Sequence, residues 1–108
     1  MSKALRRLPL YAVAAGALLS VAPPAAAAPQ THTIIVDKMK FAPVPAVRRG
    51  DTILWVNRDI LRHSATSPGH FDVDLPPGSK VAMKVTAAGS FAFVCKYHPG
   101  MRGVLTVR

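Results

Sequence analysis

Short runs of strand-forming residues, separated by turn signals such as glycine and proline, fill the chain from about residue 31 onward. β-Branched and aromatic residues dominate these runs, and the spacing of the turns is typical of an all-β sandwich or barrel. We predict strands over residues 33–36, 52–57, 80–86, 90–95 and 104–107. No amphipathic helix of useful length is evident after residue 28, so we expect two antiparallel sheets packed face to face.

Alternation along two of these runs indicates which side chains face the core. In residues 80–86 the apolar odd-numbered positions share one face, and in residues 90–95 Phe91, Phe93 and Cys95 share a face.

The first 27 residues are excluded from the predicted fold. Lys3, Arg6 and Arg7 give a positive start, an apolar run follows over residues 8–21, and two prolines and four alanines end the segment. This order is typical of a secretory signal peptide, and we place cleavage after Ala27. The apolar run is shorter than the roughly 20 residues that a spanning helix needs. We therefore expect a domain over residues 28–108 with no membrane span in the mature chain.

Charge and cysteine content narrow the function classes. Eleven of the fourteen basic residues and all five acidic residues follow the leader, which leaves a formal charge of +6 on the domain. Export and the scattered basic residues argue against nucleic acid as a partner. Cys95 is the only cysteine, so the domain cannot form an internal disulfide. The thiol is either a buried, inert side chain or is occupied by a metal ion.

A short segment near the C-terminus carries the candidate metal chemistry. Cys95, His98 and Met101 offer a thiolate, an imidazole and a thioether in a Cys-x-x-His-x-x-Met spacing, and His63 supplies a second imidazole from a loop predicted at the same end. Two His, one Cys and a weak axial Met are the donor set of a blue-copper site. Zinc is the metallic alternative, but Met is a poor zinc ligand. A Cys beside a His could also be an activated nucleophile.

The chain resembles the cupredoxin (type 1 blue-copper) family, and within it the amicyanin and plastocyanin branch. The resemblance covers residues 28–108, and its short ligand loop is similar to the amicyanin version. It rests on residues 39–41, 50–52 and 55–57, His63, the turn at 77–78, and residues 93–103.

The resemblance implies a Greek-key β-sandwich that holds one copper ion through His63, Cys95, His98 and Met101. It implies a monomeric periplasmic protein that passes single electrons between redox proteins, such as a c-type cytochrome, a dehydrogenase or a terminal oxidase. Because the four ligands would fill every strong position, we expect no enzymatic activity. The alternative is a periplasmic protein that stores or delivers copper.

Three positions near the ligands depart from the family pattern. Ser64 stands where family members commonly have Asn, Lys96 where they have Thr or Ser, and Tyr97 where many have Pro. The Asn and the Thr or Ser pair across the site in the family, so these departures concern the groups that support the ligands.

The remaining polar side chains receive simpler predictions. We expect His32 and His70 at the surface and Trp55 in the core, and we leave open whether Asn57 joins the ligand loops or merely ends a strand. We expect Pro99, Gly100 and Met101 to form an apolar rim around His98. The basic residues expected to steer an acidic partner to this rim are Arg58, Arg62, Lys96 and Arg102.

Overall fold

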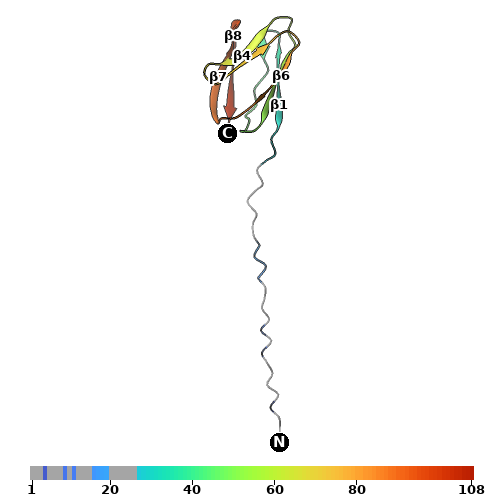
Figure 1. Ribbon diagram of the computed structural model, residues 1–108, viewed down its shortest axis with the longest axis vertical. Helices are drawn as coiled ribbons and strands as arrows, with labels where there is room; N and C mark the ends of the chain where they lie inside the picture. The colour runs from blue at the N-terminus through green and yellow to red at the C-terminus, as the bar shows by residue number, and fades with distance from the viewer. Residues whose placement is uncertain (1–3, 5–8, 10, 12–15, 20–26) are drawn as a thin grey trace.

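A computed structural model describes residues 4, 9, 11, 16–19 and 27–108 (Figure 1). Almost all of the predicted signal peptide, residues 1–27, lies outside these residues, so the leader and its cleavage site stay predictions. In the part of the chain that is described, no helix has the length and apolar character needed to cross a membrane.

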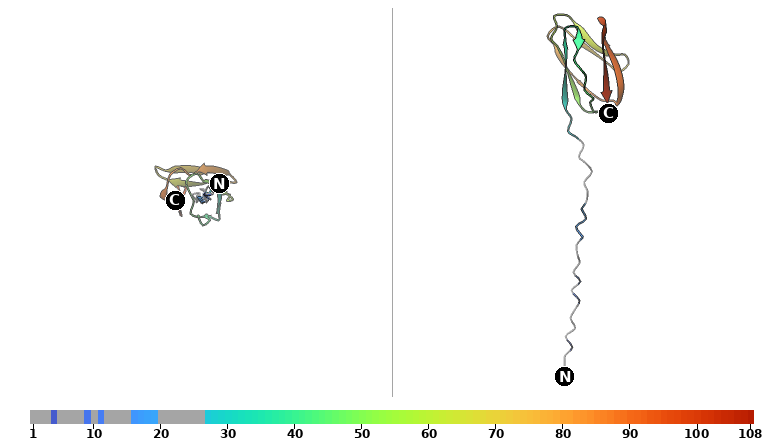
Figure 2. Two further views of the ribbon diagram at one scale, coloured as in Figure 1. Left: turned by 90° about the horizontal axis from the view of Figure 1, so that it is seen from below. Right: turned by 180° about the vertical axis from the view of Figure 1, so that it is seen from behind.

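The described residues form two sheets of four strands each. The strands are β1 (Thr31–Asp37), β2 (Lys40–Phe41), β3 (Thr52–Asn57), β4 (His63–Ser67), β5 (Phe71–Leu75), β6 (Lys80–Lys84), β7 (Gly89–Cys95) and β8 (His98–Val107). One sheet has the order β2-β1-β3-β6 and the other β5-β4-β7-β8. The two sheets lie as two layers (Figure 1, Figure 2), which confirms the predicted all-β, cupredoxin-like sandwich.

One strand pair contradicts the expectation of wholly antiparallel sheets. β1 and β3 pair in parallel, with Thr31 opposite Thr52. Between them, after β2, the chain crosses to the other sheet, where Val47 forms a parallel bridge with Val107. This excursion returns the chain to the end of the sandwich where β1 began, so β3 must run in the same direction as β1.

The observed strand boundaries agree best with the predicted ones where the sequence is apolar and β-branched. β3 has the predicted bounds, and β1, β6, β7 and β8 overlap their predicted runs. β2, β4 and β5 were not predicted. His63 opens β4 and His98 opens β8, so the expectation that both lie within loops is wrong. Only Lys96 and Tyr97 connect β7 to β8.

An aromatic cluster joins the two layers. Trp55 is fully buried, as predicted, and packs edge-on against Phe93 with ring centroids 5.3 Å apart. Phe41 packs edge-on against Phe93 at 4.9 Å, and Phe71 completes the cluster at 6.1 Å from Phe93. Such aromatic pairs each contribute about 1 kcal/mol beyond the apolar area they bury. Phe93 is therefore held on several sides, and it anchors β7 two residues before Cys95.

Asp51 ties the start of β1 to the turn that precedes β3. His32 is not the surface residue expected, because its side chain is 18% exposed and its Nε2 lies 2.9 Å from Asp51 Oδ2. The backbone N–H of Gln30 donates to Asp51 Oδ1 at 2.9 Å, and that of Arg48 donates to Oδ2 at 3.0 Å. Asp51 thus fixes the point where the chain enters the sandwich.

Replacing Asp51 with asparagine should destabilise the protein most at neutral pH. The N–H groups of Gln30 and Arg48, followed by His32, lower the pKa of Asp51 to about 2. A carboxylate with a depressed pKa contributes stability in full above its unfolded pKa of about 4 and loses it as the pH falls through its folded value. In thermal unfolding, the difference between wild type and Asp51→Asn should therefore shrink between pH 4 and pH 2. A difference that stays constant down to pH 2 would contradict this role.

Candidate metal centre

Strand order brings three of the four predicted ligands to one end of the sandwich. β4, β7 and β8 are neighbours in one sheet, with His63 first in β4, Cys95 last in β7 and His98 first in β8. Cys95 pairs with His98 across the two-residue turn. This end, here named the ligand pole, lies away from the C-terminus (Figure 1). Met101 follows His98 by three residues along β8.

Distances show which of these side chains meet. His63 Nδ1 lies 3.7 Å from Cys95 Sγ, and the rings of His63 and His98 pack with centroids 5.0 Å apart. Met101 is 5% exposed and belongs to the same buried cluster as Cys95. The described residues contain no group of three or more His, Cys, Asp or Glu side chains already arranged to hold a metal ion. The direct contact is therefore the pair His63–Cys95, and the set of four ligands stays a prediction.

The Cys95 sulfur is buried but has a polar neighbour. Its side chain has no exposed surface, and the backbone N–H of Ser64 donates to Sγ at 3.3 Å. Burial of a charged sulfur is costly unless hydrogen bonds or an opposite charge compensate it. An N–H donor on one side and an imidazole nitrogen on another are the surroundings that a metal-bound thiolate needs.

Asp59 orients the His63 ring, a contact that the sequence analysis missed. His63 Nε2 lies 2.8 Å from Asp59 Oδ2, and an ionised carboxylate can only accept, so Nε2 carries the proton. In the neutral ring, Nδ1 then presents its lone pair toward Cys95. The Met39 N–H, followed by the His63 ring, lowers the pKa of Asp59 below its ordinary value, which keeps the carboxylate ionised. A carboxylate behind an imidazole is a common partner of metal-binding histidines.

The sequence left open whether Asn57 joins the ligand loops or merely ends a strand, and its contacts show that it does more than end β3. Its side chain is buried, and Nδ2 donates to the carbonyl oxygens of Leu61 and Leu75, each at 2.8 Å. Its Oδ1 accepts the Asp59 N–H at 2.8 Å. Asn57 thus braces the loop that leads into His63 against the end of β5.

The surface of the ligand pole differs in part from the predicted rim. Met101 is buried, so it does not contribute to a rim around His98, which is itself half-buried. Pro99 and Gly100 are exposed, as expected, and further exposed apolar side chains near the ligands come from the neighbouring loops and the β7–β8 turn: Met39, Ile60, Leu61 and Tyr97.

Two of the four basic residues expected to steer a partner are already paired. Arg62 donates to both carboxylate oxygens of Asp74, and Lys96 donates to Asp72. Among the described residues, Arg58 and Arg102 have no acidic partner. The positive charge available to a partner is therefore smaller than the sequence suggested.

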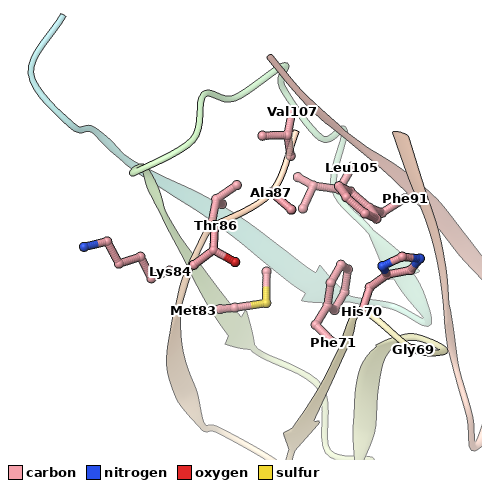
Figure 3. Close-up of a pocket in the computed structure, with 11 residues that line it drawn as sticks. Gly69, His70, Phe71, Met83, Lys84, Thr86, Ala87, Phe91, Leu105 and Val107 are labelled. Carbon is pink, nitrogen blue, oxygen red and sulfur yellow. The ribbon is translucent and has the colours of Figure 1, made fainter. Parts of the chain in front are cut away.

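A cavity of about 330 Å³ lies at the opposite end of the sandwich (Figure 3). Phe71, Met83 and Leu105 contribute its apolar wall, and His70 packs edge-on against Phe91 with ring centroids 4.7 Å apart. His70 is exposed, as predicted, and it lies at the turn after β4, whereas His63 begins that strand. His70 therefore has no place in the candidate metal centre.

Comparisons with known proteins agree with this architecture. The family model described as a cupredoxin-like domain matches residues 10–107. Amicyanin-alpha of Methylorubrum extorquens is 31% identical over 104 residues, covering 89% of this chain and 85% of the relative. Amicyanin of Paracoccus denitrificans is 35% identical over 98 residues, covering 82% and 75%.

Solved structures of amicyanins are also similar to this chain. The crystal structure of amicyanin from Paracoccus versutus has a TM-score of 0.62 and 27% identity, covering 70% of this chain and 79% of that chain. The Cu(I) form of an amicyanin variant has a TM-score of 0.64 and 28% identity, covering 76% and 86%. The domain match and the curated relatives establish that the chain belongs to the family of cupredoxin-like proteins.

Proposed function

We propose that this protein is an exported type 1 blue-copper protein that carries one electron at a time. The observation that carries the proposal is the buried Cys95 sulfur with the Nδ1 atom of His63 at 3.7 Å and the His98 ring packed against His63. His63, Cys95, His98 and Met101 would hold one copper ion. The Cu(I) form of a similar amicyanin variant supports copper as the metal.

The donor set fits copper better than other metals. Thiolate and thioether sulfur are soft ligands that suit Cu(I), and imidazole accepts both oxidation states. Bound copper would supply a couple that gains and loses a single electron. The chain's own contribution is a stiff frame: Asp59 fixes the His63 ring, and Asn57 braces the loop before it. A frame that moves little between the two oxidation states keeps the barrier to electron transfer low.

We propose a carrier rather than an enzyme, working in the periplasm as a monomer. Four protein ligands would leave no strong position for a substrate. The half-buried His98, with Tyr97 exposed beside it, gives electrons a short path to a partner's surface. The partner class is a redox protein such as a c-type cytochrome, a dehydrogenase or a terminal oxidase.

A copper titration tests this proposal. Adding one equivalent of Cu(II) to the purified, processed protein should produce an intense blue absorption, and the reduced protein should exchange electrons rapidly with its oxidised form. A protein that stays colourless with Cu(II) refutes the blue-copper assignment. A blue protein that hands its copper quickly to a chelator and exchanges electrons slowly would favour copper storage or delivery.

Replacing Met101 with glutamine should keep the copper and lower its reduction potential. The thioether favours the softer Cu(I), whereas an amide oxygen favours Cu(II), so the oxidised form gains relative stability. Voltammetry of the blue protein measures the shift. An unchanged potential would show that Met101 is packing in the core rather than a ligand.

Electron transfer to an acidic partner should weaken as salt is added. Arg58 and Arg102 give the ligand pole positive charge, and steering by exposed charges is screened at high ionic strength. With an acidic c-type cytochrome as the probe, the bimolecular rate should fall about tenfold between low and physiological salt. Arg102→Gln should lower the rate at low salt, whereas Arg48→Gln, the same charge change at the opposite end, should not. A rate that does not depend on ionic strength contradicts steering.

A further inference from the structure

The cavity at the end opposite the ligand pole has apolar walls from both sheets (Figure 3). Met83 comes from β6 in one sheet, and Phe71 and Phe91 come from β5 and β7 in the other. These three side chains pack against the core but are only partly buried, so the cavity exposes apolar surface to water. Its volume of about 330 Å³ is near the lower limit of small-molecule sites, roughly 300 Å³, and suits a short chain or a single ring.

Small residues at the rim leave this cavity open. Residues 85–88 connect β6 to β7, and only the first of them is buried. Ala87 lines the cavity but is too short to fill it. The turn between β4 and β5 contributes Gly69, at φ +78°, and His70, whose backbone N–H closes the turn with a hydrogen bond of 2.9 Å. A bulky side chain at Ala87 would occupy the space that these residues leave.

Contacts within the protein hold the cavity walls in place. Phe71 belongs to the aromatic cluster of the core. The Phe91 ring lies against His70, with ring centroids 4.7 Å apart, and so close over Gly89 that a Cβ there would stand 3.3 Å from Phe91 Cζ. Both backbone groups of Val85 are hydrogen-bonded at 2.8 Å to the turn before β3. A ligand would therefore enter a preformed site and would lose little affinity to ordering of the walls.

The ionisable side chains around this cavity are basic. Of the described residues that line it, only His70 and Lys84 have ionisable side chains, and Figure 3 shows Lys84 extending outward from the rim. Arg49 and Arg108 meet where β8 ends, directly after a residue of the cavity wall, and the Arg49 N–H donates to the Arg108 carbonyl oxygen at 3.2 Å. The inside is thus apolar, and the positive charge lies at the mouth and beside it.

Little negative charge at this end opposes that positive charge. Asp51 precedes β3 and Asp72 lies near the start of β5, and these carboxylates are paired with His32 and Lys96. In the described part of the chain, the ion pairs include neither Lys84 nor the two arginines at the end of β8. The field at the cavity mouth therefore favours an anion over a neutral or cationic group.

We propose that this cavity is a binding site for a small amphipathic carboxylate, such as a medium-chain fatty acid. The apolar chain enters between Met83 and Phe91, and the carboxylate stays in water at the mouth, within the field of Lys84. The cavity is too small for the two chains of a phospholipid, so the ligand is a free acid. Because the site lies opposite the ligand pole, the inference goes beyond the proposed function and does not depend on copper.

Titration of the purified, processed protein with octanoate tests the site. In NMR spectra of the metal-free protein, the amide signals of His70, Thr86 and Phe91 should shift and saturate, whereas that of His98 at the ligand pole should not move. Octanol keeps the chain and removes the charge, so it should bind about fivefold more weakly, and octylammonium more weakly still. No saturable shift at millimolar octanoate, or equal affinity for octanol and octanoate, overturns the proposal.

Two phenylalanine variants locate the apolar chain of the ligand. Ala87→Phe puts a ring into the cavity and should weaken octanoate binding at least about tenfold. Ala88→Phe adds the same ring at the next residue, which does not line the cavity, and should leave the affinity unchanged. Both alanines are exposed, so both variants should fold, which circular dichroism checks. If octanoate binds the two variants equally well, its chain does not enter this cavity and the proposal fails.

Two lysine variants locate the carboxylate. Lys84→Gln should weaken octanoate binding about twofold and leave octanol binding unchanged, because only the anion feels the lost charge. Lys80→Gln makes the same charge change at the other end of β6 and should alter neither affinity. Equal effects of the two lysine variants would mean that net charge alone attracts the anion, which would contradict a carboxylate held at the cavity mouth. A protein that binds octanoate as expected but never turns blue with Cu(II) would refute the proposed function and leave this site established.

Discussion

Replacing Cys95 with serine is expected to abolish the blue absorption and leave the protein folded. The absorption would arise from charge transfer between a thiolate and copper, and a serine hydroxyl is neither soft nor ionised at neutral pH. Serine is close to cysteine in size, and the Ser64 N–H could still donate to its oxygen. Visible absorption after addition of Cu(II), with circular dichroism and metal analysis on the same samples, measures the outcome.

The control for this variant must place a new hydroxyl in the same core without touching the sulfur. Ala65 has no exposed surface and lies on β4, two residues after His63. Ala65→Ser should therefore lose some stability and keep the blue absorption. If Cys95→Ser is as blue as the wild type, the ligand assignment is wrong and the proposed function fails with it.

The apolar part of the fold could be predicted because its pattern is local. β3 is β-branched and begins after a Gly-Asp turn, and its bounds agree with the prediction. β5 also carries a readable signal, since Val73 and Leu75 are buried while Asp72 and Asp74 face outward. The prediction missed it because the strong turn at residues 76–78 drew Asp74 into the turn.

β4 could not be predicted in the same way. Its residues are mostly small and polar, yet four of the five are buried. They are tolerated in the interior because partners far along the chain satisfy them, such as the Lys96 amide for Ser64. The strand is thus defined by its neighbours rather than by its own propensity.

The predicted ligands could be identified from the types and spacing of the residues, whereas the contacts that orient side chains could not. Asp59 contacts His63 only because the turn before β2 presents two N–H groups to the same carboxylate, and that turn holds Lys38 and Met39 at positive φ. His32 meets Asp51 only because β1 and β3 run parallel. Contacts of this kind depend on the register of distant strands, which no local pattern reveals.

The largest stability effect expected outside the ligands comes from adding one methyl group at Gly103. This residue lies opposite Phe93 across β7 and β8, and a Cβ at Gly103 would stand 2.3 Å from Phe93 Cζ. The ring cannot move aside, because it is 1% exposed and is packed against Phe41 and Trp55. Overpacking of this kind costs about 3 kcal/mol, so Gly103→Ala should lower the Tm of the metal-free protein by roughly 15 °C.

Two further variants separate this contact from a general effect of replacing glycine in β8. Gly100→Ala changes the same strand where nothing lies within 4 Å of the new Cβ, so it should leave the Tm nearly unchanged. Phe93→Leu removes the outer ring atoms that the methyl group would meet, so adding Gly103→Ala to it should cost less than adding it to the wild type. The difference, measured as a coupling free energy by urea unfolding, should be at least about 1 kcal/mol. Gly103 is not among the glycines with positive φ, so backbone strain cannot supply this coupling. If the two effects are instead additive, the Phe93 ring is able to move away from the new methyl group.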